Sequence, residues 1–357
     1  MTIRRYYTDS YTWAFSARAV EATTADGVPI AVLDESFFYP TSGGQPHDTG
    51  RLGAANVIDV TVREADGAIV HRLDAPIAPG PVAATIDGAR RFDHMQQHTA
   101  QHILSQAFIR VANAPTIGFH LGAETVSIDL ETKGLAEPHI AEALDAANRV
   151  VSDNVPVRAW FPSADELAAL TLRKTPEVQG PLRAVAIGDF DLSACGGTHV
   201  AHAGEIGLIS ILKTERMKRG VRVEFLAGGR ARNDYARKHA ILRDLATSLT
   251  CGPSEVPQAI ARLSGALTET RRELARYRER DLDAEAAGLL MEATGAGSLR
   301  VIAKVWAERP IDELKGLALR VTGRPGVVAL FGVAGVRTQL LFGKSEGVAL
   351  DLKPAFD

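Results

Sequence analysis

The sequence predicts an α+β fold built in three parts, and three observations support this prediction. Residues 1–90 show short strand patterns between turn residues, whereas residues 91–229 mix helical periodicity with further strand patterns. Residues 230–292 are compatible with helix almost throughout, and residues 299–357 alternate between strand and helix patterns. The length of 357 residues agrees with two or three domains of about 150 residues.

The first part is predicted to form a small β-barrel or a curled sheet. Strand patterns cover Val28–Leu33, Asn56–Val62 and Val82–Ile86, and Asp-Gly and Pro-Gly turns separate them. Several short strands of this kind close on one another. The segment Phe37–Gln45 interrupts the pattern, and its glycines let a loop approach another surface or a ligand closely.

The second part, residues 91–229, is predicted to combine two helices with a mostly antiparallel sheet. The helices cover Phe92–Val111 and Glu137–Asp153, where apolar residues recur at helical spacing. The strands are predicted over Thr125–Leu130, Leu182–Ile187, Ile206–Leu212 and Val221–Leu226. Helices interleaved with such strands are typical of an α+β domain.

The third part begins with a helical segment that breaks at Cys251-Gly252-Pro253. Its apolar residues follow alternating steps of three and four, interrupted only by the polar Thr270, as in a coiled-coil seam. The seam consists of Val256, Ile260, Leu263, Leu267, Leu274 and Tyr277. It predicts a homodimer through this segment, with packing back on the same chain as the alternative. Residues 299–357 are predicted to form a small α/β unit in the order strand, helix, strand, strand.

Composition and charge exclude several classes of protein. With 46% hydrophobic and 23% charged residues the chain has an ordinary globular composition, and no apolar run approaches the roughly 20 residues of a membrane span. The segment Met1–Tyr7 lacks the apolar core of a secretion signal. Only two cysteines, Cys195 and Cys251, exclude a disulfide scaffold and predict a reducing, cytoplasmic location. The net charge of −3 argues against a globally basic nucleic-acid-binding surface but allows a local basic patch.

Four residues have the spacing and chemistry of a zinc site. His98 and His102 lie four residues apart on a predicted helix, so both rings share one face. The segment from Cys195 to His199 adds a thiolate and a third imidazole, with two glycines between them. Three nitrogens and one sulfur suit one tetrahedral Zn²⁺ per chain. Because the two halves are far apart in sequence, the site forms only through the tertiary fold.

Other chemistries at these residues are less consistent with the sequence. A helical metalloprotease needs glutamate directly after its first histidine, where this chain has Thr99. The histidine-x-glutamate and Pro-Cys-x-x-Cys pairs of a nucleobase deaminase are absent. If Cys195 acted as a nucleophile with one histidine as its base, the other two histidines would have no role in the reaction. A purely structural zinc remains open, because four protein ligands complete the tetrahedron.

These motifs resemble a known family. His98-x-x-x-His102 with Cys195-Gly196-Gly197-Thr198-His199 resembles the paired zinc motifs of the editing domain of alanyl-tRNA synthetase. The flanking segments Arg91–Gln97 and Gly204–Gly207 also resemble that family. Phe38–Gln45 with Asp48-x-Gly50 resembles the family's glycine-rich motif. The aminoacylation core and its ATP-binding motifs have no counterpart. The whole chain therefore resembles the long form of the AlaX family of free-standing alanyl-tRNA editing proteins, less specifically beyond residue 230.

The resemblance implies an ATP-independent hydrolase that acts in trans on tRNA(Ala) mischarged with serine or glycine. It implies that zinc at His98, His102, Cys195 and His199 acts beside the ester carbonyl. His94, one turn before His98, allows a shifted assignment of the ligands. Water positioned by zinc and assistance by the terminal ribose hydroxyl are both compatible with the sequence. The sequence is also compatible with either serine or glycine as the amino acid that is removed. The alternative function is a non-catalytic tRNA-binding or dimerisation module with structural zinc.

Further residues are candidates for the catalytic and substrate-binding site. Gln45, with Gly43 and Gly44, is a candidate for substrate contact, and a turn that packs the first part on the second is the alternative. Thr99 and His120 are candidates to line the amino-acid pocket, where a hydroxyl or imidazole can bind the hydroxyl of serine; ordinary packing is the alternative.

Two further roles are predicted outside the pocket. Asp191, four residues before Cys195, is a candidate to orient a ligand histidine, with turn capping as the alternative. A basic hairpin is the candidate tRNA-binding surface, with a solvated charged face as the alternative. The hairpin carries Lys213, Arg216, Lys218, Arg219 and Arg222, and Arg230, Arg232, Arg237 and Lys238 continue it.

Overall fold

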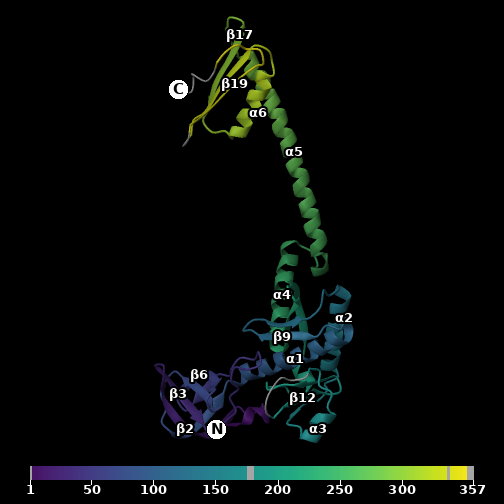
Figure 1. Cartoon of the computed structure of the whole chain (residues 1–357). Helices are drawn as coiled ribbons and strands as arrows, with labels where there is room; N and C mark the ends of the chain where they lie inside the picture. Colours follow the sequence, from purple (N-terminus) through teal and green to yellow (C-terminus); the bar gives the residue numbers. More distant parts are fainter. Residues whose placement is uncertain (1, 175–180, 336–337, 352–357) are drawn as a thin grey trace. The chain divides into compact units, whose positions relative to one another are not determined.

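The computed structural model describes residues 2–174, 181–335 and 338–351. The chain forms two compact units, Met1–Ile241 and Leu242–Asp357 (Figure 1). The boundary falls inside the helix α4 (Gly228–Ser248), so the first unit contains both predicted N-terminal parts. Met1 and residues 352–357, which the first and third predicted parts include, lie outside the described residues.

The first unit begins with a closed six-stranded barrel, which confirms the predicted barrel. Its strands are joined in the order β2-β3-β7-β6-β5-β8. They are β2 (Ala14–Ala25), β3 (Val28–Leu33), β5 (Gly50–Leu52), β6 (Ala55–Val62), β7 (Ile69–Leu73) and β8 (Gly80–Ile86). Alternation along the strands buries apolar side chains such as Leu33, Val60 and Ile69 inside the barrel. Two short strands form a separate sheet, in which β1 (Ile3–Arg4) pairs in parallel with β4 (Glu35–Ser36). The 3-10 turn η1 covers Arg5–Tyr7.

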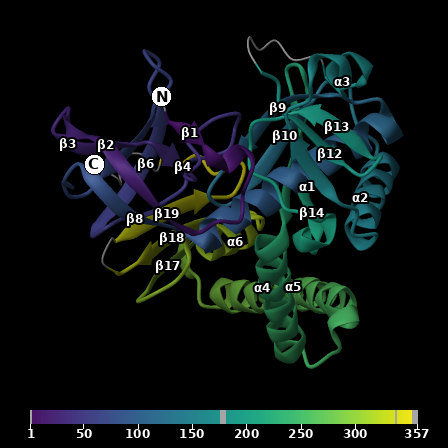
Figure 2. The same ribbon diagram turned by 90° about the horizontal axis from the view of Figure 1, so that it is seen from below.

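The helix α1 (Gly88–Ala112) connects the barrel to the rest of the unit. The side chain of Asp87 caps its first turn by accepting from the backbone N–H of Arg90, and Asn113 ends it in the left-handed conformation. Figures 1 and 2 show the barrel at one end of α1 and the remaining elements of the unit around the helix. Polar as well as apolar side chains of α1 are buried, including both histidines of the predicted zinc motif.

Two antiparallel sheets pack around α1 and confirm the α+β class. One sheet has the order β14-β15-β10-β9 and the other the order β11-β12-β13. The first sheet consists of β9 (Thr116–Leu121), β10 (Val126–Leu130), β14 (Ile209–Met217) and β15 (Gly220–Ala227). The second consists of β11 (Val157–Trp160), β12 (Ala184–Ile187) and β13 (Asp191–Ala194). The helices α2 (Glu137–Ser152) and α3 (Ala164–Ala169) and the turn η2 (Ala203–Ile206) complete the unit.

The second unit is a long helix followed by a small α/β sheet. After η3 (Pro253–Glu255) come α5 (Val256–Met291) and α6 (Ile311–Thr322), with a sheet in the order β16-β17-β18-β19. Its strands are β16 (Thr294–Ala296), β17 (Leu299–Trp306), β18 (Val327–Val333) and β19 (Gln339–Lys344). Only the C-terminal end of α5 joins this core, through residues such as Leu282 and Leu289.

The predicted coiled-coil seam lies mostly uncovered on α5. Val256 is buried, whereas the other five seam residues are between 49% and 62% exposed. Among the described residues, no helix combines the length and apolar character that crossing a bilayer requires.

Candidate metal centre

Four side chains from two distant segments converge on one point in the first unit. His98 and His102 project from one face of α1, and Cys195 and His199 lie in the loop after β13. Their ligand atoms all lie within 4.8 Å of one another. The Nε2 atoms of His98 and His199 are each 3.3 Å from Sγ of Cys195. Three ring nitrogens and a sulfur gathered in this way are the donor set that Zn²⁺ prefers.

The outer nitrogen of His98 is held by the glycine-rich loop of the barrel. Oε1 of Gln45 lies 2.8 Å from Nδ1 of His98 and also accepts from the backbone N–H of Thr198 at 3.1 Å. Nε2 of Gln45 donates to Oγ1 of Thr198 at 2.8 Å. Because the amide oxygen accepts, Nδ1 of His98 carries the proton and Nε2 offers its lone pair to the centre. Gln45 thus ties both halves of the centre together.

The other two histidines have equivalent partners. Nδ1 of His102 lies 3.1 Å from the carboxylate of Asp191. Nδ1 of His199 lies 3.1 Å from Oγ1 of Thr99, whose hydroxyl donates to the carbonyl of Met95 at 2.8 Å and therefore accepts from the ring. Each imidazole is fixed in the tautomer that leaves Nε2 free to bind a metal.

The environment favours the metal-binding protonation state at Cys195 and His199, whereas at His102 burial is outweighed by Cys195 and Asp191, which raise the pKa of that ring above its ordinary value. Burial alone would raise the pKa of Cys195, but the three surrounding histidines outweigh it and place the thiol's pKa well below its usual value. Burial lowers the pKa of His199 to about 3, so this ring is neutral at pH 7. Burial would also raise the pKa of Asp191, but the hydrogen bond with His102 and the charge of Arg173 bring it below its ordinary value.

The Cys195–His199 loop needs glycine to reach its position. A Cβ on Gly197 would lie 2.1 Å from Cε1 of His98, so no larger residue fits there without displacing the ring. The backbone N–H of Gly197 points at Sγ of Cys195 over 3.3 Å. The Arg183 guanidinium donates to the carbonyls of Cys195, Gly197 and Tyr7, each at 2.9 Å. The loop is therefore fixed from both sides.

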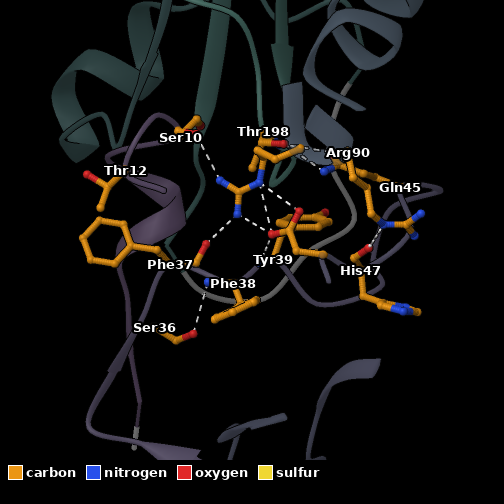
Figure 3. A network of polar contacts seen from close by, with 12 residues as sticks. Ser10, Thr12, Ser36, Phe37, Phe38, Tyr39, Gln45, His47, Arg90 and Thr198 are labelled. Atoms are coloured by element: carbon orange, nitrogen blue, oxygen red, sulfur yellow. Dashed lines mark hydrogen bonds and ion pairs between the residues drawn. The ribbon is translucent and has the colours of Figure 1, made fainter. Parts of the chain in front are cut away.

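A buried ion pair anchors the segment that carries Gln45 (Figure 3). Arg91 on α1 and Asp48 are both fully buried and pair with each other. Arg91 also donates to the carbonyls of Ser10 at 3.1 Å and Phe37 at 2.6 Å, and Asp48 accepts from the backbone N–H of Tyr39 at 2.6 Å. The contacts hold the loop at both ends, on either side of Gln45.

A cavity of about 940 Å³ opens onto the centre. His98, His102 and Cys195 form part of its wall. Its other lining residues include four cations, namely Arg4, Arg173, Lys174 and Arg183, and three aromatic residues, namely Tyr7, Phe119 and Phe161. Among the described residues that line it there is no Asp or Glu. The cavity therefore suits an anionic ligand with an apolar part.

The structure distributes the remaining predicted site residues differently. Gly43 lines the cavity, whereas Gly44 packs against β9, where a Cβ would lie 2.7 Å from the carbonyl oxygen of Phe119. The hydroxyl of Thr99 is occupied by protein partners, and it lies outside the lining. His120 is exposed and is also outside the lining, which ends at its neighbour Phe119 on β9.

The basic hairpin is β14–β15, and its charges are partly paired. Lys213 pairs with Glu224 at 3.1 Å, and Arg222 pairs with Asp129 at 2.7 Å. Arg216, Lys218 and Arg219 are exposed, and within the described parts of the chain no ion pair involves them. The continuation is more fully paired: Arg230 binds Asp93, and Arg237 and Lys238 bind Asp234. Arg232 is exposed.

His94 does not join the centre. It is buried one turn before His98, and its Nδ1 has no hydrogen-bond partner among the described residues. Burial lowers its pKa to about 4. The four grouped ligand residues are the ones that the sequence motif predicts, without a shift of register.

The fold and the site define a class of protein in which a β-barrel is joined to an α+β body that carries a cluster of three buried histidines and one partly buried cysteine. Residues 182–224 match the family model described as the Threonyl and Alanyl tRNA synthetase second additional domain. The chain is 31% identical to an alanine–tRNA ligase of Pyrococcus furiosus over 92% of its length and 33% identical to that of Thermococcus kodakarensis over 98%. It is 32% identical to the alanyl-tRNA editing protein Aarsd1 of Mus musculus over 66% of its length.

The chain is therefore similar to alanine–tRNA ligases and to an alanyl-tRNA editing protein. It spans 37% and 38% of the length of the two ligases and 58% of the length of the mouse editing protein.

Proposed function

We propose that this protein is a zinc-dependent hydrolase that acts in trans in the cytoplasm and removes serine or glycine from mischarged tRNA(Ala). The observation that carries the proposal is the cluster of His98, His102, Cys195 and His199, three of which line a cavity that also contains four cations. The likeness to a protein named for alanyl-tRNA editing supports the choice of substrate. A separate editing site is useful because a pocket for alanine discriminates poorly against amino acids that differ by one methyl or hydroxyl group.

The residues present fit zinc. The donor set and the three fixed tautomers match a tetrahedral zinc site with supporting hydrogen bonds. When bound, zinc supplies positive charge that polarises oxygen atoms close to it. Four protein ligands already complete a tetrahedron, so a catalytic role requires a fifth position or a weakly held ligand.

The chain's own residues have positioning roles in this proposal. Gln45, Asp191 and Thr99 orient the ligand histidines, and Gly43 lies on the cavity wall. No carboxylate of the described lining is placed to act as a general base. We therefore assign proton removal to no side chain, and the terminal ribose hydroxyl of the substrate remains a candidate to assist.

We also propose two partners. The exposed Arg216, Lys218 and Arg219 of the β14–β15 hairpin are the part of the predicted basic surface most available to tRNA phosphates. The exposed seam of α5 supports a homodimer through that helix.

The proposal is tested by measuring amino-acid release from Ser-tRNA(Ala), Gly-tRNA(Ala) and correctly charged Ala-tRNA(Ala). We expect the zinc-loaded protein to release serine or glycine much faster than alanine, and the pair of rates gives the preference. If neither serine nor glycine is released, the hydrolase proposal is wrong and a non-catalytic tRNA-binding module is favoured. The specific observation in favour of that alternative is the set of four protein ligands, which completes a structural zinc site.

Replacing Gln45 by Met is expected to weaken zinc binding by about 10- to 100-fold, the usual cost of losing a partner behind a metal ligand. The change keeps the side-chain volume but removes the acceptor for Nδ1 of His98. Zinc affinity is measured by competition with a chelator, and Gln45→Glu, which keeps an acceptor oxygen, should restore most of it.

Gln97→Met is the matched control. Gln97 is an equally buried glutamine that exchanges two hydrogen bonds with the backbone of Ala227 and donates a third to Asp93 at 3.2 Å, and none of these partners belongs to the centre. This variant should lose stability and keep its zinc affinity. Unchanged zinc affinity in Gln45→Met would show that the contact with His98 does not support the metal.

A further inference from the structure

We propose that a second cavity of the first unit binds a free amino acid with a large apolar side chain. The cavity has a volume of about 590 Å³, within the range of small-molecule sites. Its wall comes from the C-terminal half of α1, from residues 170–173 after α3, and from β11, β12 and β13 with the turn between the last two. None of the four candidate metal ligands lines it, so the inference is independent of the proposed function.

One face of α1 contributes to both cavities. His102, Gln106 and Arg110 follow one another at steps of four on this helix, so they share a face. His102 lines the first cavity, whereas Gln106 and Arg110 line the second. The stripe that carries the metal ligands therefore continues into a second site with different chemistry.

Arg110 is placed to bind a carboxylate. Its guanidinium lies over the Phe190 ring, 4.1 Å from the centroid, and one of its nitrogens donates to the carbonyls of Asp189 at 3.3 Å and Phe190 at 2.7 Å. Arginine has five N–H groups, and the two used here leave three without a partner among the described residues. Because the planar group is already held in place, a carboxylate can bind it at a low cost in side-chain entropy.

An acceptor for a donor group of the ligand lies one helical turn before Arg110. Oε1 of Gln106 is buried and has no hydrogen-bond partner in the described part of the chain. Buried polar atoms are almost always paired, so this oxygen indicates a donor that the protein itself does not supply. The carboxylate of Asp189, which is exposed and belongs to the same wall, adds a negative charge. A positively charged nitrogen suits both groups.

Much of the remaining wall is apolar. It includes the aliphatic side chains of Ile109, Leu172 and Leu192 and the aromatic rings of Trp160 and Phe190. Aromatic rings of a cavity wall favour contact with a further ring, through its face or its edge. The apolar part of the ligand is therefore a large side chain, with an aromatic ring as the best match.

Two further charged residues line the cavity, but they already pair with each other. Arg173 lies 3.2 Å from the Asp191 carboxylate and donates to Ser193 at 3.0 Å, and Asp191 also binds Nδ1 of His102. The charges left for a ligand are one guanidinium and one carboxylate, beside the unpaired amide oxygen. A zwitterion with an apolar body, such as phenylalanine, matches this set of groups.

The test is isothermal titration calorimetry of the full-length protein with phenylalanine and two analogues that each lack one charge. Phenethylamine lacks the carboxylate, and 3-phenylpropionate lacks the ammonium group. The wild type should bind phenylalanine about 10-fold more tightly than either analogue, because each analogue loses a hydrogen bond that involves a charged group.

Two variants assign these charges to their partners. Arg110→Met should weaken the binding of phenylalanine and 3-phenylpropionate about 10-fold and leave that of phenethylamine unchanged. Gln106→Met should weaken the binding of phenylalanine and phenethylamine about 10-fold and leave that of 3-phenylpropionate unchanged. Because Gln106→Met removes a buried oxygen without a protein donor, it should not lower the melting temperature.

Arg149→Met is the matched control for Arg110→Met. Both arginines are exposed and lie in the last turn of a helix, but Arg149 belongs to α2 and lines neither cavity. Arg4→Gln changes a cation of the first cavity alone and so separates the two cavities. Both controls should bind phenylalanine as the wild type does. Thermal melts followed by circular dichroism check that each variant is folded.

The inference is wrong if the wild type shows no saturable binding of phenylalanine up to its solubility limit, or if it binds all three compounds equally. Unchanged binding by Arg110→Met and Gln106→Met would also overturn it. Weaker phenylalanine binding by Arg4→Gln would place the ligand in the first cavity and contradict it as well. The expected pattern supports the inference whether or not the protein hydrolyses mischarged tRNA(Ala).

Discussion

Replacing Cys195 by Ala is expected to abolish stable zinc binding and to lower the rate of amino-acid release from mischarged tRNA(Ala) by more than about 100-fold. Loss of a supporting partner costs a metal site up to about this factor, and a direct ligand should cost more. The substitution removes the only sulfur of the centre and leaves three imidazoles. Metal content and release of serine and glycine are measured on the same preparation.

Cys251→Ala is the matched control for this prediction. It is the only other cysteine of the chain, lies in the second unit and has no place in the four-residue centre. We expect it to keep both zinc and activity. Cys195→Ser checks that any loss does not come from misfolding alone, because serine keeps an acceptor for the N–H of Gly197. Full activity of zinc-free Cys195→Ala would contradict the metal assignment.

Replacing Arg91 by Met is expected to lower the free energy of unfolding of the first unit by about 3–5 kcal/mol, the typical cost of removing one partner of a buried ion pair. The change leaves the Asp48 carboxylate buried without its cation and removes the donors to Ser10 and Phe37. Urea unfolding is followed by the fluorescence of Trp13 and Trp160 in a Trp306→Phe background, so that only the first unit reports.

Two further variants make this result specific. Asp48→Asn added to Arg91→Met removes the unpaired charge and should recover part of the lost stability, because the asparagine can still accept from the N–H of Tyr39. Arg63→Met removes a partly exposed surface arginine that pairs with Glu21 and Asp66, and it should have a much smaller effect. Equal stability of the single and the double variant would show that the buried charge is not the cause.

Much of the fold could be predicted from local sequence patterns. Strand β3 occupies the predicted residues Val28–Leu33, and α2 ends one residue before the predicted end at Asp153. The break in the third part falls where Gly252 and Pro253 predict it, between α4 and α5. These elements have clear periodicity and turn residues, so their local conformational preference agrees with the structure that the tertiary contacts stabilise.

Other elements carry no local signal of that kind. The long strand β2 consists mainly of alanine, threonine and charged residues, and it is a strand because β3 and β8 pair with it on either side. The short β9 contains a glycine and a histidine and depends on β10. The predicted strand Ile206–Leu212 begins three residues late, at Ile209, because η2 occupies Ala203–Ile206.

The candidate centre was more predictable than the cavity around it. Its four ligands have characteristic residue types and spacing, and the structure groups the same four. The pairing of Gln45 with His98 and of Asp191 with His102 required the fold, although both residues were candidates from their motifs. Arg4, Phe161 and Arg183 had no signal, because single cations and aromatic residues in strands or loops are ordinary.

The central claim is that zinc held by these four residues supports hydrolysis of mischarged tRNA(Ala). Its most direct test is the rate of serine and glycine release from Ser-tRNA(Ala) and Gly-tRNA(Ala), measured as metal-stripped protein is titrated with Zn²⁺. The proposal predicts no release without metal and a rate that rises with bound zinc until one ion per chain is reached. Release at the full rate from metal-free protein, or no release from either substrate at full zinc occupancy, would contradict it.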